Sequence, residues 1–311
     1  KNTSDDTRWI LENVIDYRKT INKHSLCFTG LYSAEEDKYE ALSASAYGFL
    51  NDNLTYNNIS TASSCNPPSS DASRWSMTSL MGRANYNYDE KYLVTLTYRR
   101  DGYSVFGANK KYGNFPSAAL AWRVSQENFM KKYDFISQLK LRVAWGKNGN
   151  QSIKPYSSEA KIVTSVPYAF GSSTDVVYGF YPSTIANSSL GWETTTSSNI
   201  GLDFGLFKNR ISGTVEFYHA STNDLLLTRG IPYTTGYSSI YDNVGETQND
   251  GVEFTLSTIN ITRPGGFKWS SNINLSYNKN KIVDLYGDKK DDLGNNWFIG
   301  KPINVYYDYV F

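Results

Sequence analysis

The segment NYNYDEKYLVTLTYRRDGYSVF, residues 85–106, carries the clearest structural signal in the chain. From Tyr92 to Tyr98 the even positions are apolar, whereas the odd positions become increasingly polar toward Asp101. A period of two residues puts all even positions on one face of a β-strand and all odd positions on the other. Such a strand can meet lipid on one face and water on the other, which is the pattern of a membrane β-barrel.

The same alternation recurs along the chain, for example from Leu139 to Trp145 and from Ile200 to Leu206. Stretches of about nine residues or more are typical of membrane strands, because most strands of soluble sheets are shorter. The pattern predicts an all-β chain with about ten or eleven strands of a larger antiparallel transmembrane β-barrel. The predicted strands cover residues 8–19, 22–34, 76–88, 91–101, 115–124, 137–147, 193–207, 210–222, 249–262 and 267–280.

The predicted connections alternate in length, a feature that the period of two does not require. The short links lie near residues 20–22, 89–90, 125–136, 208–209 and 263–266, and the long ones at 35–75, 102–114, 147–192, 223–248 and from 281 onward. Outer-membrane barrels have short periplasmic turns and longer extracellular loops. We therefore expect recognition to lie in the long segments. The 125–136 link is expected to hold a short helical turn.

Composition excludes several classes of function. Lys and Arg (31) nearly balance Asp and Glu (30), so the basic footprint of a nucleic-acid-binding protein is missing. No run of about 18 apolar residues occurs, which excludes a transmembrane helix. The 25 Tyr and 7 Trp lie in a chain whose mean hydropathy is −0.49, as two-faced strands require. Residues 1–7 do not resemble a signal peptide, so any export signal is expected to lie outside this chain.

Metal and cofactor sites are not indicated. Cys27 and Cys65 have no metal-ligand spacing, and His24 and His219 have no ligand-type neighbours in the sequence. We therefore expect satisfied or solvated side chains at these four positions, with no metal and no cofactor.

Catalytic motifs are not found either. The sequence contains no nucleophile elbow, phosphate-binding loop or zinc-protease motif. The carboxylate pairs Glu35-Glu36 and Asp291-Asp292 are expected in loops as solvated charges. A glycosidase would need two carboxylates that face one cleft, and the sequence selects no such pair. The chain is therefore predicted not to be an enzyme.

Aromatic residues gather beside the predicted turns. They are Tyr86, Tyr88 and Tyr92 at one turn, Trp122 and Phe129 at another, and Phe204 and Phe207 at a third. In a barrel such rings form the girdle at the membrane interface. Ordinary cross-strand pairing in a soluble sheet also enriches Tyr and Trp. The position beside the turns favours the girdle.

Ordered motifs that span nearly the whole chain resemble those of the SusC/RagA-like TonB-dependent outer-membrane transporters. In the first half these motifs are residues 85–93, 99–104, 106–107, 112–113, 115–117, 121–123, 139–142, 146 and 149–151. In the second half they are residues 190–194, 199–204, 217–218, 222–226, 232, 235–237, 243–245, 250–253 and 278–282. Each motif alone is weak, but the complete set in the expected order is specific.

The resemblance implies that residues 1–311 are a fragment of the β-barrel region of such a receptor. The family's plug domain and TonB-engaging segment are missing from this sequence, and the last strands are expected beyond Phe311. About ten or eleven strands cannot close a barrel of about 22. An open sheet with two free edges would aggregate unless neighbouring strands were supplied.

The resemblance also implies a function. Family members carry large nutrients, usually glycan oligomers and sometimes peptides, across the outer membrane of Gram-negative, Bacteroidetes-like bacteria. Energy comes through TonB, and a surface lipoprotein that resembles SusD caps the barrel. The expected partners are therefore TonB through the missing N-terminal region, the lipoprotein, outer-membrane lipid and an oligosaccharide or peptide ligand, with no nucleic acid.

Two groups of residues are candidates for a site. Aromatic residues of the long loops can stack on ligand rings: Trp75, Tyr168, Phe170, Tyr178, Tyr181, Tyr237, Tyr241 and Trp297. Polar residues expected to face the lumen are Arg83, Arg99, Asp101, Arg123, Lys140, Arg142, Asp203, Glu216 and Glu253. The alternative for the first group is packing within its own loops. The alternative for the second is pairing across strands in a wet interior.

Two other classes of protein share some of these features. A secreted β-sandwich that binds carbohydrate would have similar Tyr and Trp content and turn spacing. Strand length and the alternation of short and long links disfavour it. A passive porin or adhesin barrel would differ only in the N-terminal region that this chain does not contain.

Overall fold

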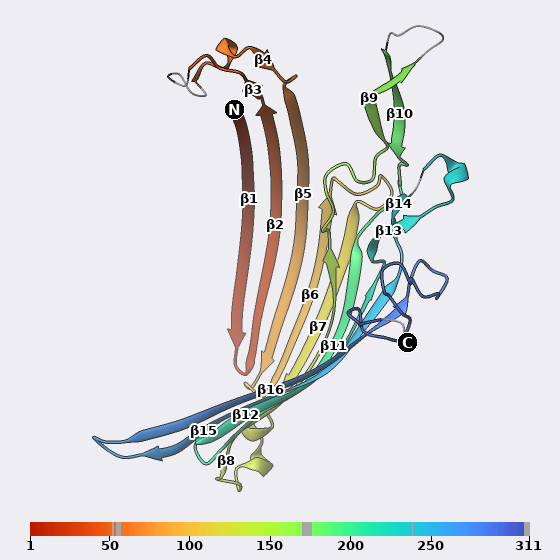
Figure 1. The fold of residues 1–311 in the computed structure, drawn as a ribbon. Helices are drawn as coiled ribbons and strands as arrows, with labels where there is room; N and C mark the ends of the chain where they lie inside the picture. Colours follow the sequence, from red (N-terminus) through yellow and green to blue (C-terminus); the bar gives the residue numbers. More distant parts are fainter. Residues whose placement is uncertain (52, 54–56, 170–175, 238, 308–311) are drawn as a thin grey trace.

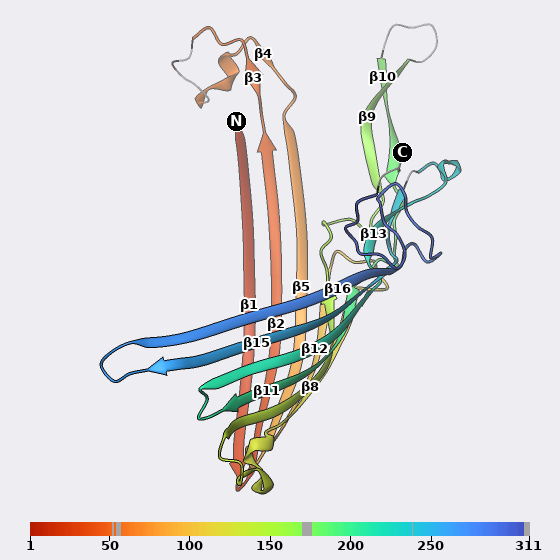
Figure 2. The same cartoon turned by 60° about the horizontal axis from the view of Figure 1, so that its bottom comes forward.

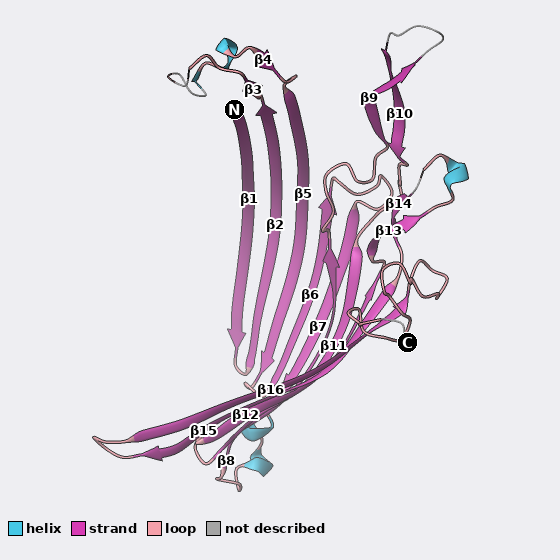
Figure 3. Cartoon of the chain, viewed as in Figure 1, coloured by secondary structure: helices cyan, strands magenta, loops and turns pink. Residues whose placement is uncertain are grey.

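The computed structural model describes residues 1–51, 53, 57–169, 176–237 and 239–307. Across these residues, ten strands form one antiparallel sheet (Figures 1 and 3). In order across the sheet, they are β1 (Asn2–Ile21), β2 (His24–Ser43), β5 (Ser69–Tyr88), β6 (Tyr92–Tyr103), β7 (Tyr112–Trp122), β8 (Ile136–Asn150), β11 (Glu193–Leu206), β12 (Ile211–Asn223), β15 (Glu246–Thr262) and β16 (Lys268–Asp284). The ten predicted strands and their antiparallel arrangement are thereby confirmed. Because the described strands form one large sheet with no second sheet packed on it, the β-sandwich alternative is wrong.

The short links are tight turns at one end of the sheet, the lower end in Figure 1. Asp89 and Glu90 both have positive φ angles (54° and 56°), and so do Lys208 and Asn209 (56° and 60°). Two such residues in succession match the twist of the flanking strands in a hairpin. The exception is the link between β7 and β8, which contains the 3-10 helices η3 (Val124–Gln126) and η4 (Asn128–Met130). The predicted helical turn is confirmed there.

The first three strands extend much further toward the loop end than predicted. β1, β2 and β5 are 20 residues long, so the predicted loop at 35–75 is confined to residues 44–68. In this extension apolar and polar residues no longer alternate regularly, and ion pairs between neighbouring strands link the side chains instead. Glu35 contacts Arg8 and Glu36 lies 2.9 Å from Arg74, on opposite faces of β2. The prediction that Glu35-Glu36 lies in a loop is therefore wrong.

Three small hairpins occupy segments that were predicted as loops. They are β3 (Ala46–Tyr47) with β4 (Ser64–Cys65), β9 (Lys161–Ala169) with β10 (Val176–Thr184), and β13 (Leu226–Gly230) with β14 (Ser239–Asn243). The second of these hairpins stands above the sheet in Figure 1. The described residues also form the 3-10 helices η2 (Ile59–Thr61) and η5 (Tyr233–Thr235). No helix among the described residues is long and apolar enough to cross a membrane.

The registers sort the side chains onto two faces. Leu96 pairs with Ala84 and Ala118, and the apolar row continues through Trp145 on β8. Thr97 pairs with Arg83 on the opposite face. The apolar face is open: Leu80, Leu120 and Ile200 are all more than half exposed. This sheet is therefore the wall of a transmembrane barrel, with one face suited to lipid.

The sheet bends into an open trough, as Figure 2 shows most clearly. Side chains of the polar face converge across intervening strands, because Arg142 on β8 reaches Glu216 on β12 over β11. On the apolar face the large side chains are splayed and exposed. We therefore refer to the polar face as the inner face and the apolar face as the outer face.

Aromatic rings form a row on the outer face beside the short turns. Tyr88, Tyr92 and Trp122 stack in succession, with ring centroids 6.3 and 6.4 Å apart. The Tyr92 hydroxyl donates to Glu127 at 2.7 Å, and the Trp122 indole N–H donates to the same oxygen at 3.2 Å. Rings with one apolar side and a hydrogen-bonded tip suit a membrane interface. The geometry thus favours the girdle at this turn.

Charged residues of three turns meet below this row. Asp89 lies 3.0 Å from Lys23 and 3.5 Å from Lys91, which in turn lies 3.4 Å from Glu127. Hydrogen bonds from Tyr92 and Trp122 hold the pKa of Glu127 below its usual value. The hydrogen bond from Lys23 lowers the pKa of Asp89 in the same way. Both groups are therefore stabilised as carboxylates.

Acid is expected to loosen the β7–β8 link before it affects the sheet. Since the folded-state pKa of Glu127 lies below the unfolded value, its contribution is complete above that value and is lost as pH falls through the folded pKa. Protection of amides 123–135 from hydrogen exchange, corrected for intrinsic rates, should thus decline below about pH 4.5. Glu127→Gln should weaken that protection at neutral pH. Equal protection at pH 3 and pH 7 in the native protein would contradict the assignment.

Candidate functional site

An aromatic core closes the loop end of the inner face. Tyr103, Val105, Phe106, Phe115 and Trp192 are buried together there. The Phe106 and Trp192 ring centroids lie 5.1 Å apart, and those of Phe115 and Trp192 lie 5.3 Å apart. The Trp192 indole N–H donates to the Lys111 carbonyl at 3.1 Å. This aromatic core fixes the loop after β6 and the segment before β11 to the sheet.

Glycines in neighbouring strands make room for these rings. A Cβ atom on Gly113 or Gly149 would lie 2.4 or 2.2 Å from the Phe115 ring. A Cβ on Gly107 would lie 2.3 Å from the Ser188 carbonyl oxygen. Such distances are too short for a side chain, so the backbone must be glycine at these points of close approach. The sequence therefore supplies both the large rings and the spaces that hold them.

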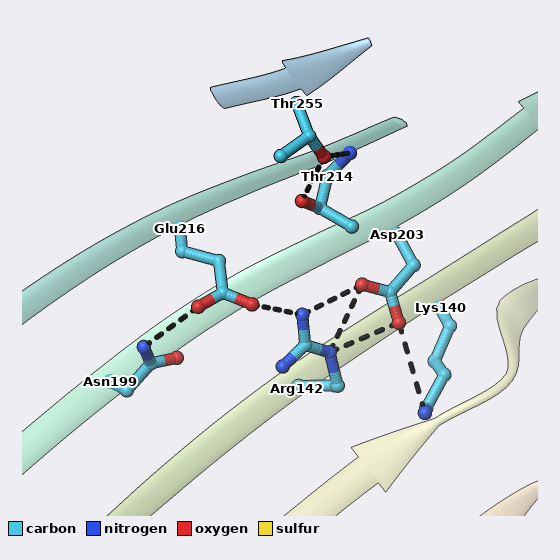
Figure 4. A network of polar contacts seen from close by, with 7 residues as sticks. All are labelled: Lys140, Arg142, Asn199, Asp203, Thr214, Glu216 and Thr255. Atoms are coloured by element: carbon cyan, nitrogen blue, oxygen red, sulfur yellow. Dashed lines mark hydrogen bonds and ion pairs between the residues drawn. The ribbon is translucent and has the colours of Figure 1, made fainter. Parts of the chain in front are cut away.

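A charge network lies on the inner face nearer the short turns (Figure 4). The Arg142 guanidinium donates to Asp203 at 2.7 and 3.0 Å and also contacts the Glu216 carboxylate. Lys140 lies 3.7 Å from Asp203, and the Asn199 amide donates to Glu216 at 3.2 Å. Thus Arg142 links strands β8, β11 and β12 through charge-assisted hydrogen bonds.

Gly201 lets Arg142 cross the middle strand. A Cβ atom at Gly201 would lie 3.0 Å from the guanidinium Nη2 and 3.1 Å from its Cζ. The register places Gly201 directly between Arg142 on β8 and Glu216 on β12. A larger residue would push the guanidinium away from one of its two carboxylates.

A second charged group lies toward the loop end of the inner face. The Arg99 Nε donates to both oxygens of Asp101, at 2.8 and 2.9 Å, and Arg99 also donates to the Ser79 hydroxyl at 3.0 Å. Asp101 and Ser79 are buried. The pair lies beside the aromatic core, because Arg99 and Phe115 are register partners. Here an ion pair within β6, together with the cross-strand hydrogen bond to Ser79, accounts for the two charges.

The other predicted lumen residues have different positions. Arg83 lies on the inner face and donates to the Thr97 hydroxyl at 3.2 Å. Glu253 faces Glu216 directly and makes no ion pair with any described residue. Arg123 lies just beyond the end of β7, where it contacts Glu90 of the neighbouring turn. Arg123 is therefore at the turn end of the sheet, and its position facing the lumen stays a prediction.

Trp75 was predicted to be a loop residue, but it lies on β5. Its ring meets Tyr103 edge-on at 5.7 Å, and the Arg8 guanidinium lies 5.6 Å from its centroid. Cross-strand pairing with β2 extends β5 beyond the segment in which apolar and polar residues alternate, so Trp75 lies in the sheet and not in a loop. Trp75 packs on the edge of the aromatic core and lines an open recess of about 750 Å³ with Arg8 and Tyr103.

The remaining loop aromatics do not converge on one place. Tyr168, Tyr178 and Tyr181 lie on the β9–β10 hairpin, Tyr241 lies on β14, Tyr237 lies just before β14, and Trp297 lies in the segment after β16. The Tyr168 ring covers Gly179 of its own hairpin. Tyr178 and Tyr181 are 68% and 51% exposed, so they are free to contact a ligand or partner. Phe170 lies outside the described residues.

Sequence reasoning missed the aromatic core and the glycines that accommodate it. Four of its members, Tyr103, Phe106, Phe115 and Trp192, lie in the family motifs at residues 99–104, 106–107, 115–117 and 190–194, whereas Val105 lies in none of them. The occurrence of large aromatic residues and glycines in adjacent predicted strands was a signal from which this core could have been predicted. Among the described residues, no group of three or more His, Cys, Asp or Glu side chains is placed to hold a metal ion.

The fold and its two faces define a class of protein: part of the wall of a transmembrane β-barrel. A family model described as "TonB dependent receptor-like, beta-barrel" matches residues 2–306. The chain belongs to the TonB-dependent receptor family.

Relatives support the narrower resemblance to SusC and RagA. TonB-dependent receptor P26 of Formosa agariphila is 40% identical over 282 residues, which are 90% of this chain and 28% of that protein. TonB-dependent receptor SusC of Bacteroides thetaiotaomicron is 36% identical over 223 residues, 71% of this chain and 22% of that protein. A structure of the RagAB peptide transporter superimposes with a TM-score of 0.85 at 28% identity, covering 97% of this chain and 33% of that chain. The chain therefore spans about a third or less of each of these relatives.

Proposed function

We propose that this chain forms part of the wall of an outer-membrane active transporter for a large nutrient. The observation that carries the proposal is the two-faced sheet of a TonB-dependent receptor, with tight turns at one end and long segments at the other. The turns lie in the periplasm and the long segments at the cell surface of a Gram-negative, Bacteroidetes-like bacterium. TonB supplies the energy of transport through the plug region of the full-length receptor.

The inner face is proposed to line the transport pathway. Most of its charges are paired, either across strands (Arg142 with Asp203) or within β6 (Arg99 with Asp101), which supports a structural role for these residues. Glu253 is the exception, and it stands opposite Glu216. Like charges at a directly opposed pair destabilise a sheet. Arg142 pairs with Glu216, so Glu253 carries the charge without an ion pair among the described residues, and a positively charged plug side chain or passing ligand would pair with it.

The exposed aromatic residues above the sheet are proposed to contact the nutrient and a lipoprotein partner that resembles SusD. Tyrosine rings offer flat apolar surfaces for sugar rings and hydroxyls for polar groups. Glycan oligomers are the proposed ligands, with peptides as the second candidate because the RagAB neighbour is a peptide transporter. None of the described residues forms a catalytic arrangement in this proposal.

Cell fractionation of the full-length receptor tests the proposed location. The receptor should be recovered with the outer membrane and migrate faster on a gel without boiling, because a closed barrel resists detergent until heated. Uptake of labelled glycan oligomers and labelled peptides should then require TonB. Recovery of a soluble protein without the heat-dependent shift would refute the proposal.

Deleting the β9–β10 hairpin is expected to reduce uptake without disturbing the barrel. Its two ends are adjacent, since the Lys161 N–H donates to the Thr184 hydroxyl at 3.0 Å. Residues 162–183 can therefore be replaced by Asn-Gly, a pair that favours a tight turn. The heat-dependent shift should remain because the aromatic core is untouched. Unchanged uptake would remove this hairpin from the recognition surface.

A further inference from the structure

A shallow groove runs along the outer face between β5 and β8. Its volume is about 470 Å³. It is lined by the larger side chains of Phe28, Leu96, Tyr98 and Trp145 and by the smaller residues Gly82, Ala84, Thr97, Pro116, Ser117 and Ala118. None of these residues is charged. An elongated apolar chain would fit such a groove better than a bulky group would.

Two cations stand where the groove meets the loop end of the outer face. Arg100 follows Tyr98 by two residues on β6, and Lys147 follows Trp145 by two residues on β8, so both share the outer face. The Arg100 guanidinium lies 4.8 Å from the Tyr112 ring centroid. β7 lies between their strands, and the registers place Lys147 two residues short of the level of Arg100, so their backbones are about 12 Å apart.

These cations lack the carboxylates that accompany others at the same end of the sheet. Among the described residues, neither Arg100 nor Lys147 forms an ion pair, whereas Arg74 lies 2.9 Å from Glu36. Beside them the Tyr98 hydroxyl donates to the side-chain oxygen Oδ1 of Asn114 at 2.8 Å. The top of the groove therefore presents two positive charges and several polar groups toward the membrane surface. Each such cation near an anionic surface contributes about 1 kcal/mol of attraction.

We propose that this groove and its two cations bind a phosphorylated glycolipid of the leaflet on the loop side. One acyl chain would lie over Gly82, Ala84 and Ala118, and phosphate would meet Arg100 and Lys147. Cations whose backbones are about 12 Å apart, with hydroxyl and amide groups near them, suit a phosphorylated sugar head group better than a single phosphodiester. The inference rests on the orientation in the proposed function, but it concerns lipid and not the transported nutrient.

Native mass spectrometry of the full-length receptor in nanodiscs tests the proposal. Lipid A, phosphatidylglycerol and phosphatidylcholine serve as separate probes. The unmodified receptor should retain lipid A in preference to both phospholipids. Arg100→Gln with Lys147→Gln should reduce that retention about 30-fold, the equivalent of two cations at the membrane surface. Ala118→Leu should reduce retention of lipid A by filling the groove.

Lys19→Gln provides a matched control. Lys19 lies on the outer face near the short-turn end of β1, where it pairs with Leu26. Its substitution should therefore leave retention of lipid A unchanged. The proposal would be overturned if the double variant retained lipid A as well as the unmodified receptor does, or if the unmodified receptor preferred phosphatidylglycerol. Uptake and heat-dependent migration are measured on the same variants. Failure of lipid binding with normal uptake would leave the transporter assignment intact.

Discussion

Trp192→Ala is expected to lower the free energy of unfolding of the full-length receptor by about 3–5 kcal/mol. The indole is buried between Phe106 and Phe115, and its removal leaves a cavity that Gly113 and Gly149 cannot fill. The loop after β6 would lose its main attachment to the sheet. Denaturant titration of the receptor in lipid vesicles gives the value.

Trp192→Phe separates packing from hydrogen bonding at this position. It retains an aromatic ring but loses the donor to the Lys111 carbonyl, which should cost about 1–2 kcal/mol. A loss below about 1 kcal/mol for the alanine variant would show that the aromatic core does not hold the loop end together.

Arg142→Met is expected to destabilise the sheet by about 3 kcal/mol, because it leaves Asp203 and Glu216 without their shared cation. Both carboxylates are largely covered, with exposed fractions of 15% and 25%. The same denaturant titration measures the effect. Gly201→Val should reproduce part of it, since a side chain there displaces the guanidinium.

Glu253→Gln is the matched control for the network. It lies on the same inner face directly opposite Glu216 but has no ion pair among the described residues. Removing its charge should leave stability unchanged or raise it slightly, because it relieves a like-charge pair. A loss for Glu253→Gln as large as that for Arg142→Met would contradict the special role of Arg142.

Most of the fold follows from local rules that act within two adjacent strands. The period of two sets which side chains face lipid, and tight turns such as Asp89-Glu90 set the register. The long extension of β1, β2 and β5 could not be predicted in this way. Polar pairs such as Arg74 with Glu36 hold it together, and they have no apolar periodicity to detect.

The candidate sites depend on contacts that cross several strands. The alternation of apolar and polar residues places Arg142, Asp203 and Glu216 on one face of the sheet. That they form one network depends on Gly201, whose missing side chain leaves room for the Arg142 guanidinium to cross β11. The aromatic core joins segments more than 80 residues apart, as the contact of Trp192 with Lys111 illustrates. Sequence periodicity contains no information at that separation. For the same reason, the loop aromatics were predicted as a group although the structure distributes them over separate hairpins.

Accessibility along β6 tests the account most directly. In a Cys27→Ser, Cys65→Ser background of the full-length receptor, single cysteines at residues 92–99 would carry a spin label in lipid vesicles. Collisions with dissolved oxygen should peak at positions 92, 94, 96 and 98, and collisions with a water-soluble nickel complex at the positions between them. Equal access of the nickel complex to both sets, or the opposite phase, would contradict a wall with its apolar face in lipid.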